Sequence, residues 1–323
     1  MKRLLPALAS PRVTLAGFAL LAATVLAGLH WPQWPTSAYV APLAGLGVNL
    51  AAAIATRPAL RQGGLGVFHL ALLAFLLLAL WGRLTHFDAR VEVAEEGFFD
   101  PALVQVTGQG PWHGEAWKRL QFRQGGWEVD YRPGVKRAHT RSLVWLPEDA
   151  ATSRTVGDDT ALVLAGYRFY TTPNKGFAPL LTWQQAGAPA QQGVLHMPSY
   201  PMFDWRQENA WTTPGGTALR FWLRLDRPIA QDASWTLSPR DVAAVLVVEA
   251  AGTRHELRPG DAIALPQGTL RYERLLGWMG YRIFYDPTLL PLLLVALAGV
   301  AGLAWHLWQR AGRLAPALQG APA

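Results

Sequence analysis

Long apolar runs near both ends of the chain enclose a middle part in which apolar and polar residues alternate. No charged residue occurs between Val13 and Thr56, between Gln62 and Gly82, or between Pro287 and Gln309. A helix needs about 20 apolar residues to cross the hydrocarbon layer of a membrane, and the first run is long enough for two such helices. The pattern therefore predicts four membrane-spanning helices, three before the middle part and one after it.

The first run is interrupted by residues 29–39, which contain two prolines and three aromatic side chains. This composition is typical of an interfacial turn, so we expect helices near Val13–Leu29 and Ala41–Thr56. The third helix is expected over Gly63–Gly82 and the fourth over Pro287–Gln309. The first helix has an alternative interpretation as a signal peptide, because basic residues precede it. A second apolar run directly after it, with no clear small-x-small cleavage site, favours a membrane helix.

Residues 83–286 show the two-residue period of half-buried strands. Five stretches alternate in this way, namely Arg90–Val93, Leu103–Val106, Leu120–Arg123, Trp127–Tyr131 and Leu219–Leu225. Clusters of glycine, proline and aspartate separate the strands, and no long segment has a helical period. We therefore predict an all-β, sandwich-like domain inserted between the third and fourth helices. The predicted domains are residues 1–82, 83–286 and 287–323.

The charges divide the chain in the same way. All 22 acidic residues lie between Asp88 and Asp286, so residues 83–286 hold 22 basic residues against 22 acidic ones. The segments on either side carry only basic residues, which are Lys2, Arg3, Arg12, Arg57, Arg61, Arg310 and Arg313. The positive-inside rule then places both termini in the cytoplasm and the β domain outside it. The net charge of +7 belongs to the membrane flanks, which argues against nucleic-acid binding.

Motifs of common enzymes are missing from the sequence. The chain has no cysteine, which excludes a disulfide, a thiolate metal site and a cysteine nucleophile. The stretch Gly108–Gly114 has one residue too many for a dinucleotide-binding turn and is expected to be a loop between strands. No two histidines have a metal-binding spacing, so a zinc or copper site would have to be assembled by the fold. Ten of the fifteen tryptophans lie in the middle part, where core packing is favoured over a haem or peptide groove.

His69 is the one ionisable residue in the third apolar run. An imidazole inside a membrane must hydrogen-bond or bind a ligand, and such residues are functional candidates. Gly63, Gly64 and Gly66 lie within two turns of it and leave a flat surface. That surface can admit a planar ligand beside the imidazole, or it can let another helix approach closely. His69 is therefore either a ligand of a bound group or a neutral histidine bonded to a neighbouring helix.

His306 is a second, weaker candidate. It lies on the fourth predicted helix near the same side of the membrane as His69, so the two imidazoles could approach one embedded ligand. The other interpretation places His306 in an interfacial belt with Trp305 and Trp308.

Several segments, in this order, resemble the ResB family of system II cytochrome c maturation. They are Leu8–Arg12, Phe68–Leu73, Trp81–Arg83, Phe87–Gly97, Val129–Tyr131, Lys136–Trp145, Gly166–Tyr170 and Tyr281–Pro287. The resemblance implies a non-enzymatic subunit of a haem-delivery and cytochrome c synthetase complex in the bacterial inner membrane. It also implies a CcsA-like (ResC) membrane partner with a tryptophan-rich haem motif, a thioredoxin-like thiol reductase, and apocytochrome c as the protein served.

Within this resemblance, the haem-ligating histidine of the third helix falls on His69, and the implied cofactor is haem b. The β domain is shorter than is typical of the family. Two other functions stay open on the residues alone. One is a membrane-anchored β domain that acts as a scaffold or binding module in the cell envelope. The other is an envelope enzyme with a site built from scattered residues, which requires a deep polar pocket.

Overall fold

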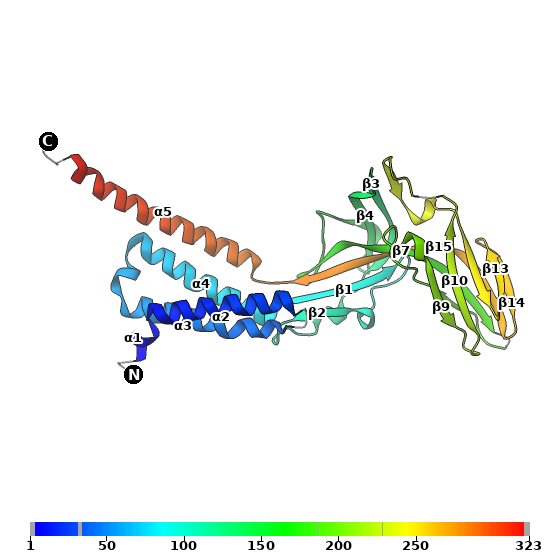
Figure 1. The fold of residues 1–323 in the computed structure, drawn as a ribbon, viewed down its shortest axis with the longest axis horizontal. Helices are drawn as coiled ribbons and strands as arrows, with labels where there is room; N and C mark the ends of the chain where they lie inside the picture. The colour runs from blue at the N-terminus through cyan, green and yellow to red at the C-terminus, as the bar shows by residue number, and fades with distance from the viewer. Residues whose placement is uncertain (1–3, 32–33, 186, 228, 320–323) are drawn as a thin grey trace. The chain divides into compact units, whose positions relative to one another are not determined.

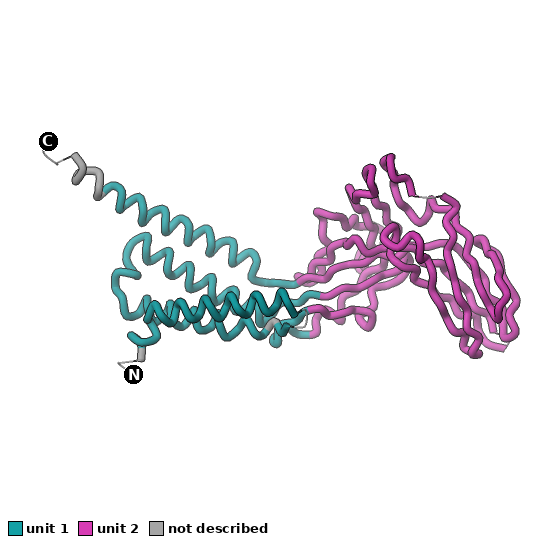
Figure 2. Tube along the Cα trace, viewed as in Figure 1, with its two compact units in different colours: residues 1–88, 108–114, 285–323 teal, residues 89–107, 115–284 magenta. Residues whose placement is uncertain are grey.

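The computed structural model describes residues 4–31, 34–185, 187–227 and 229–319, which form two compact units (Figure 2). Unit 1 comprises residues 1–88, 108–114 and 285–323, and unit 2 comprises residues 89–107 and 115–284. All the α-helices of the described residues belong to unit 1, whereas the β-sheets lie mainly in unit 2 (Figure 1). Residues 108–114, which the sequence analysis placed in the β domain, group with the helices.

Four helices of unit 1 are long and apolar enough to cross a membrane, which confirms the number and order of the predicted helices. The α-helices are α1 (Leu4–Leu8), α2 (Pro11–His30), α3 (Val40–Thr56), α4 (Gly63–Thr85) and α5 (Leu289–Gln319). Short 3-10 turns precede α3 and α4, namely η1 (Thr36–Tyr39) and η2 (Pro58–Arg61). The five-residue helix α1 was not predicted.

A buried asparagine fixes the start of the bundle. Asn49 of α3 is 5% exposed and donates from Nδ2 to the carbonyl oxygens of Leu8 and Ser10, at 2.5 and 3.2 Å. Its Oδ1 accepts a hydrogen bond of 2.7 Å from the hydroxyl of Thr14. The side chain of Ser10 in turn caps α2 by accepting from the backbone N–H of Arg12. Asn49 therefore satisfies carbonyl groups that an apolar surrounding would otherwise leave without partners.

Three antiparallel sheets make up the β-rich part, which confirms its predicted class. The largest sheet has the order β2-β1-β15-β7-β6, with β14 paired to β15 and β8 paired to β7. Its strands are β1 (Phe87–Ala94), β2 (Gln105–Gln109), β6 (Leu162–Leu164), β7 (Tyr167–Gln185), β8 (Gln191–Val194), β14 (Ala262–Leu265) and β15 (Gly268–Tyr285).

Two four-stranded sheets accompany the largest one. The first has the order β11-β3-β4-β5 and the second has the order β13-β12-β10-β9. Their strands are β3 (Arg123–Arg132), β4 (Lys136–Leu146), β5 (Asp149–Gly157), β9 (Glu208–Thr212), β10 (Ala218–Leu225), β11 (Trp235–Leu237), β12 (Ala244–Ala250) and β13 (Thr253–Leu257). Short 3-10 turns occur between the strands, namely η3 (Pro101–Leu103), η4 (Ala116–Arg119), η5 (Asp204–Arg206) and η6 (Pro239–Asp241).

The long strands β7 and β15 pair over most of their length and give each small sheet a surface to pack on. At one end, the hydroxyl of Tyr281 on β15 lies 2.7 Å from the hydroxyl of Ser142 on β4. At the other end, the rings of Trp183 on β7 and Trp211 on β9 meet edge to face at 5.9 Å. Each small sheet therefore packs against one end of the β7–β15 pair, as the two sheets of a sandwich do.

Two predicted strands are wrong in part. Leu103 ends η3, where the Asp100 side chain accepts from the N–H of Ala102 at 2.8 Å, so β2 begins only at Gln105. Likewise, β3 begins only at Arg123, although Leu120–Arg123 alternates in sequence. Leu120 and Phe122 are buried at 7% and 0% exposure, so an ordered loop delivers them to the core. Alternation in Leu120–Arg123 thus marks burial without a strand ladder, whereas Leu103 and Val106 are 60% and 45% exposed.

The ten tryptophans of the middle part differ in burial, and three of them, Trp145, Trp211 and Trp235, are half-buried. Four are buried, namely Trp117, Trp127, Trp183 and Trp278. Trp112, Trp205 and Trp222 are instead 62%, 76% and 48% exposed. The core-packing prediction is therefore right for the first group and wrong for these three.

Candidate functional site

His69 lies in the second turn of α4, where the helix itself holds its ring. Nδ1 lies 2.8 Å from the carbonyl oxygen of Leu65, one turn earlier. Because a carbonyl oxygen can only accept, Nδ1 carries the proton, and a neutral ring then has its lone pair on Nε2. No described residue provides Nε2 with a hydrogen bond. The half-buried ring meets Phe68 edge-on at 5.3 Å. Metal-binding histidines have this arrangement, with one ring nitrogen donating to an acceptor and the other facing the metal.

The space beside two of the glycines before His69 is filled by backbone atoms of other residues of the chain. A Cβ atom on Gly64 would lie 2.5 Å from the backbone nitrogen of His306 and would also meet the carbonyl oxygen of Gly302. A Cβ atom on Gly66 would lie 2.5 Å from the carbonyl oxygen of Arg61. Of the two sequence interpretations of this surface, the close approach of another helix is therefore the one observed at Gly64.

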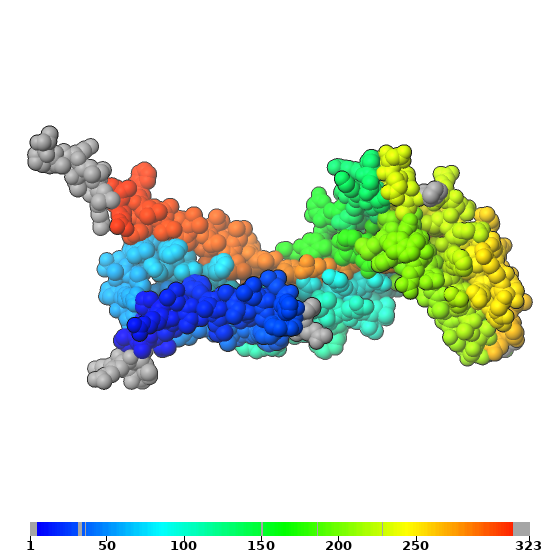
Figure 3. All heavy atoms as spheres, viewed as in Figure 1, coloured from blue at the N-terminus to red at the C-terminus, as the bar shows by residue number. Residues whose placement is uncertain are grey.

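His306 lies on the face of α5 that packs against α4, and the two helices are side by side in the space-filling view (Figure 3). Ala71 and Gly299 continue the same contact one to two turns further along. His69 is five residues beyond Gly64, which is about 140° around the helix at 3.6 residues per turn. The backbone contact at Gly64 thus brings His306 to one face of α4 and leaves His69 on another.

The loop 108–114 closes the end of α4. The N–H groups of Trp112 and Gly110 donate to the carbonyl oxygens of Leu84 and His86, at 2.8 and 2.9 Å. Nδ1 of His113 lies 2.8 Å from the carbonyl oxygen of Thr85. These bonds satisfy carbonyl groups that the last turn of a helix leaves open. Gly108 and Gln109 are the last residues of β2, so the predicted loop is right only for residues 110–114, and the observed role of this loop is to cap a helix.

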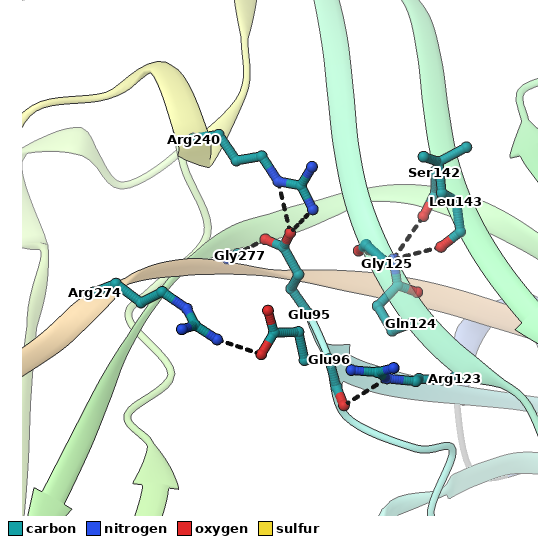
Figure 4. Close-up of polar contacts among 10 residues, drawn as sticks. All are labelled: Glu95, Glu96, Arg123, Gln124, Gly125, Ser142, Leu143, Arg240, Arg274 and Gly277. Carbon is teal, nitrogen blue, oxygen red and sulfur yellow. Dashed lines mark hydrogen bonds and ion pairs between the residues drawn. The ribbon is translucent and has the colours of Figure 1, made fainter. Parts of the chain in front are cut away.

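The acidic pair Glu95 and Glu96, just after β1, makes two ion pairs within unit 2, with Arg240 of η6 and Arg274 of β15 (Figure 4). The side chain of Glu95 is 2% exposed and accepts two hydrogen bonds from the guanidinium of Arg240, at 2.9 and 2.5 Å. Glu96 pairs with Arg274 on the surface, where both side chains are about half exposed (51% and 44%). Glu95 and Glu96 therefore have a structural role in the described residues.

A groove on unit 2 was not foreseen from the sequence. It has a volume of about 690 Å³ and brings together Glu92 of β1, Asn174 of β7 and His196. Nδ1 of His196 lies 3.6 Å from one carboxylate oxygen of Glu92, and Nδ2 of Asn174 donates to the other at 2.7 Å. The contact with His196 lowers the pKa of Glu92, burial opposes this, and the hydrogen bond from Asn174 lowers the pKa as well. These residues are far apart in sequence, so no spacing rule could have identified the groove.

Lys175, the residue after Asn174 on β7, is buried at 1% exposure. Burial, with a smaller contribution from the nearby Arg137, lowers the pKa of its amine from 10.5 to about 8. Its Nζ donates to the carbonyl oxygen of Pro173 at 3.3 Å and lies 5.4 Å from the centre of the Tyr131 ring. The amine is therefore held by one carbonyl and one ring, without a carboxylate hydrogen bond among the described residues.

Lys175 makes the stability of unit 2 depend on pH. Between about pH 8 and 10.5 the unfolded chain keeps the Lys175 proton and the folded chain loses it, so folding becomes more favourable as pH rises. We expect the denaturation midpoint of the wild type to rise over this range relative to Lys175→Met. The exposed Lys136→Met serves as the control and should run parallel to the wild type. Parallel curves for Lys175→Met and the wild type would contradict the prediction.

Among the described residues, no group of three or more histidine, aspartate or glutamate side chains is placed to hold a metal ion. This finding concerns metal ions that are bound by side chains alone. A haem iron needs only one protein ligand on each face, so His69 is still a candidate haem ligand. No family model matches the chain, and no curated protein matches it.

Proposed function

We propose that this protein is a ResB-like subunit of a membrane complex that delivers haem and helps to attach it to apocytochrome c outside the cytoplasm. In this proposal His69 is an axial ligand of haem b, and the β-rich part faces the apocytochrome. The protein itself is a non-catalytic assembly factor.

The observation that carries the proposal is the hydrogen bond between Nδ1 of His69 and the carbonyl oxygen of Leu65. It fixes the ring and reserves Nε2 for a ligand, which is the preparation that an axial histidine needs. A single imidazole in an apolar helix can supply only one ligand to a metal. The metal must therefore bring most of its other ligands with it. Haem does so, because the porphyrin supplies four nitrogen ligands and the protein supplies the axial ones.

The order of the elements supports the same proposal. Three apolar helices precede the β-rich part and one follows it, as in the family that the sequence resembles. Basic residues flank the helices on the sides assigned to the cytoplasm, and all acidic residues lie in the part assigned to the outside. His69 then falls in the half of α4 nearer to the cytoplasm, where haem made inside the cell enters the membrane.

The proposal divides the work between this chain and its partners. Haem supplies the iron and the porphyrin that becomes attached to apocytochrome c. His69 would hold the iron through Nε2, and α5 supports α4 through the glycine contacts at Gly64, Gly299 and Gly302. A CcsA-like (ResC) protein would supply the tryptophan-rich haem motif and the second ligand. A thioredoxin-like reductase would keep the apocytochrome thiols reduced, beside a chain that has no cysteine to exchange with them.

We expect His69→Ala to lower the haem content of the purified complex severalfold. The substitution removes the only ionisable side chain of α4 between Gly63 and Gly82, and with it the proposed iron ligand. The measurement is the absorption spectrum of the complex of this chain with its CcsA-like partner, normalised to protein. His30→Ala is the matched control, because His30 also lies in a membrane helix but is exposed at its end, 5.0 Å from the ring of Trp31. Full haem occupancy in His69→Ala would overturn the assignment.

A second candidate function is a binding module anchored in the membrane by the four helices. It is favoured by the exposed side chains of Met202, Phe203 and Trp205, which project from one loop of unit 2. Exposed apolar side chains clustered in this way are typical of interaction sites. This function requires neither haem nor His69, so a complex that is colourless when isolated with its partner would favour it.

A further inference from the structure

The loop of residues 110–114 groups with the helices of unit 1, although the chain continues from it into unit 2. Two hydrogen bonds of 2.8 Å tie the loop to the last turn of α4. One runs from the N–H of Trp112 to the carbonyl oxygen of Leu84, and the other joins Nδ1 of His113 to that of Thr85. The backbone of the loop is therefore fixed to the end of α4.

This loop presents the side chain of Trp112 outward. The side chain is 62% exposed, and its ring meets the ring of Trp81 at a centroid distance of 5.8 Å and an interplanar angle of 70°. Trp81 is itself 49% exposed and lies on one face of α4 with the exposed Leu70 and Leu77. The exposed apolar stripe of α4 therefore continues past the end of the helix onto the loop.

The phospholipid bilayer is the partner that fits this surface. The stripe belongs to a helix that is long and apolar enough to cross a membrane, and Trp112 extends it at the end where the charge-free run stops at Arg83. Tryptophan is enriched where hydrocarbon meets water, because its ring is apolar and its N–H is polar. Arg83 is exposed beside Trp81, and a cation at this level suits the phosphates of lipid headgroups.

A second pair of tryptophans lies at the same end of the helices. Trp31 follows α2 and stacks on Trp34 at a centroid distance of 6.0 Å, and both side chains are exposed. The guanidinium of Arg83 lies 5.2 Å from the centre of the ring of Tyr39, which ends η1. This contact places the turn after α2 beside the end of α4. The two tryptophan pairs thus mark one level of the membrane.

We infer that residues 110–114 form a lipid-binding loop, in which Trp112 and Trp81 lie among the headgroups and upper acyl chains of phospholipids, with Arg83 at the level of the phosphates. The inference goes beyond the proposed function, because it needs neither haem nor a protein partner. It also sets the depth of α4. His69 is twelve residues before Trp81, about 18 Å along a helix, which is more than half of a hydrocarbon layer about 30 Å thick.

The test uses the full-length chain with fluorotryptophan at all fifteen tryptophan positions, in nanodiscs of phosphatidylethanolamine and phosphatidylglycerol. Trp112→Phe and Trp81→Phe assign the two fluorine resonances by their loss, so the measurement itself is made on the wild-type side chains. We expect a lipid with a nitroxide near its headgroup to broaden both resonances. A gadolinium chelate in the water should broaden them severalfold less than it broadens the resonance of Trp222.

Trp222 is the matched control, because it is 48% exposed but lies on β10 with the guanidinium of Arg254 over its ring at 5.3 Å. Its resonance should respond to the gadolinium chelate and not to the nitroxide lipid. The resonance of Trp127, which is 2% exposed, should respond to neither reagent. A Trp112 resonance that responds to gadolinium as strongly as that of Trp222, or to neither reagent, would overturn the inference.

Discussion

Replacing Gly64 with leucine is expected to separate α4 from α5. The space beside Gly64 is filled by backbone atoms of Gly302 and His306, with the His306 nitrogen only 2.5 Å from a Cβ atom on Gly64. Backbone atoms cannot rotate away as a flexible side chain can, so the helices must move apart. Helices in membranes associate largely through such close packing of small residues, because lipid gives them little hydrophobic reason to pair.

The absence of cysteine makes this separation simple to measure. A Cβ atom on Gly299 would lie 3.4 Å from the Cβ atom of Ala71, close to the spacing in a disulfide of about 3.5–4.5 Å. The chain with Ala71→Cys and Gly299→Cys should therefore form a cross-link when membranes are oxidised. Adding Gly64→Leu should reduce the yield of this cross-link severalfold.

Gly45→Leu is the matched control for this experiment. Gly45 also lies in a membrane helix, α3, but a Cβ atom there would meet nothing within 4 Å. The cross-link yield should therefore stay at the level of the parent chain. Efficient cross-linking in the Gly64→Leu chain would show that the glycine contact does not hold the two helices together.

Replacing Arg240 with methionine is expected to destabilise unit 2. The carboxylate of Glu95 is 2% exposed and would lose its charged partner (Figure 4). Removing one partner of a buried ion pair typically lowers the free energy of unfolding by about 3–5 kcal/mol. Because Arg240 is 62% exposed, we expect a loss at the lower end, about 3 kcal/mol. The unfolding midpoint in denaturant, followed by tryptophan fluorescence, should fall accordingly.

The neighbouring pair provides a control of the same chemistry. Arg274 pairs with Glu96, but both side chains are about half exposed, at 51% and 44%. Exposed pairs contribute about 0–1 kcal/mol, so Arg274→Met should shift the midpoint little. The double change Glu95→Gln with Arg240→Met should recover part of the loss, because no buried charge then remains. Equal shifts for Arg240→Met and Arg274→Met would contradict the account of the buried pair.

The sequence predicted the helices well because one physical requirement dominates them. A charge-free run of about 20 residues has few alternatives to a membrane helix, and the observed bounds of α2, α3 and α4 lie within three residues of the expected ones. The strands were harder to place, because alternation of apolar and polar residues does not determine which strands pair or where they begin. Leu120 and Phe122 are buried without belonging to a strand for that reason.

The candidate sites also differ in how far the sequence could predict them. His69 could be identified because an ionisable residue in an apolar run is unusual wherever the helix lies. The use of Gly64 could not be decided, since glycine admits a ligand and a neighbouring helix equally well. The groove depends on Glu92, Asn174 and His196 meeting across strands far apart in sequence, and only the fold brings them together.

The most direct test of haem ligation at His69 is chemical rescue with imidazole. His69→Gly, purified with its CcsA-like partner, removes the side chain and leaves a space that free imidazole can fill. The proposal predicts that the mutant complex loses the haem spectrum of the wild type and that added imidazole restores it. A wild-type complex without haem, or a His69→Gly complex whose spectrum is unchanged before imidazole is added, would contradict the proposal.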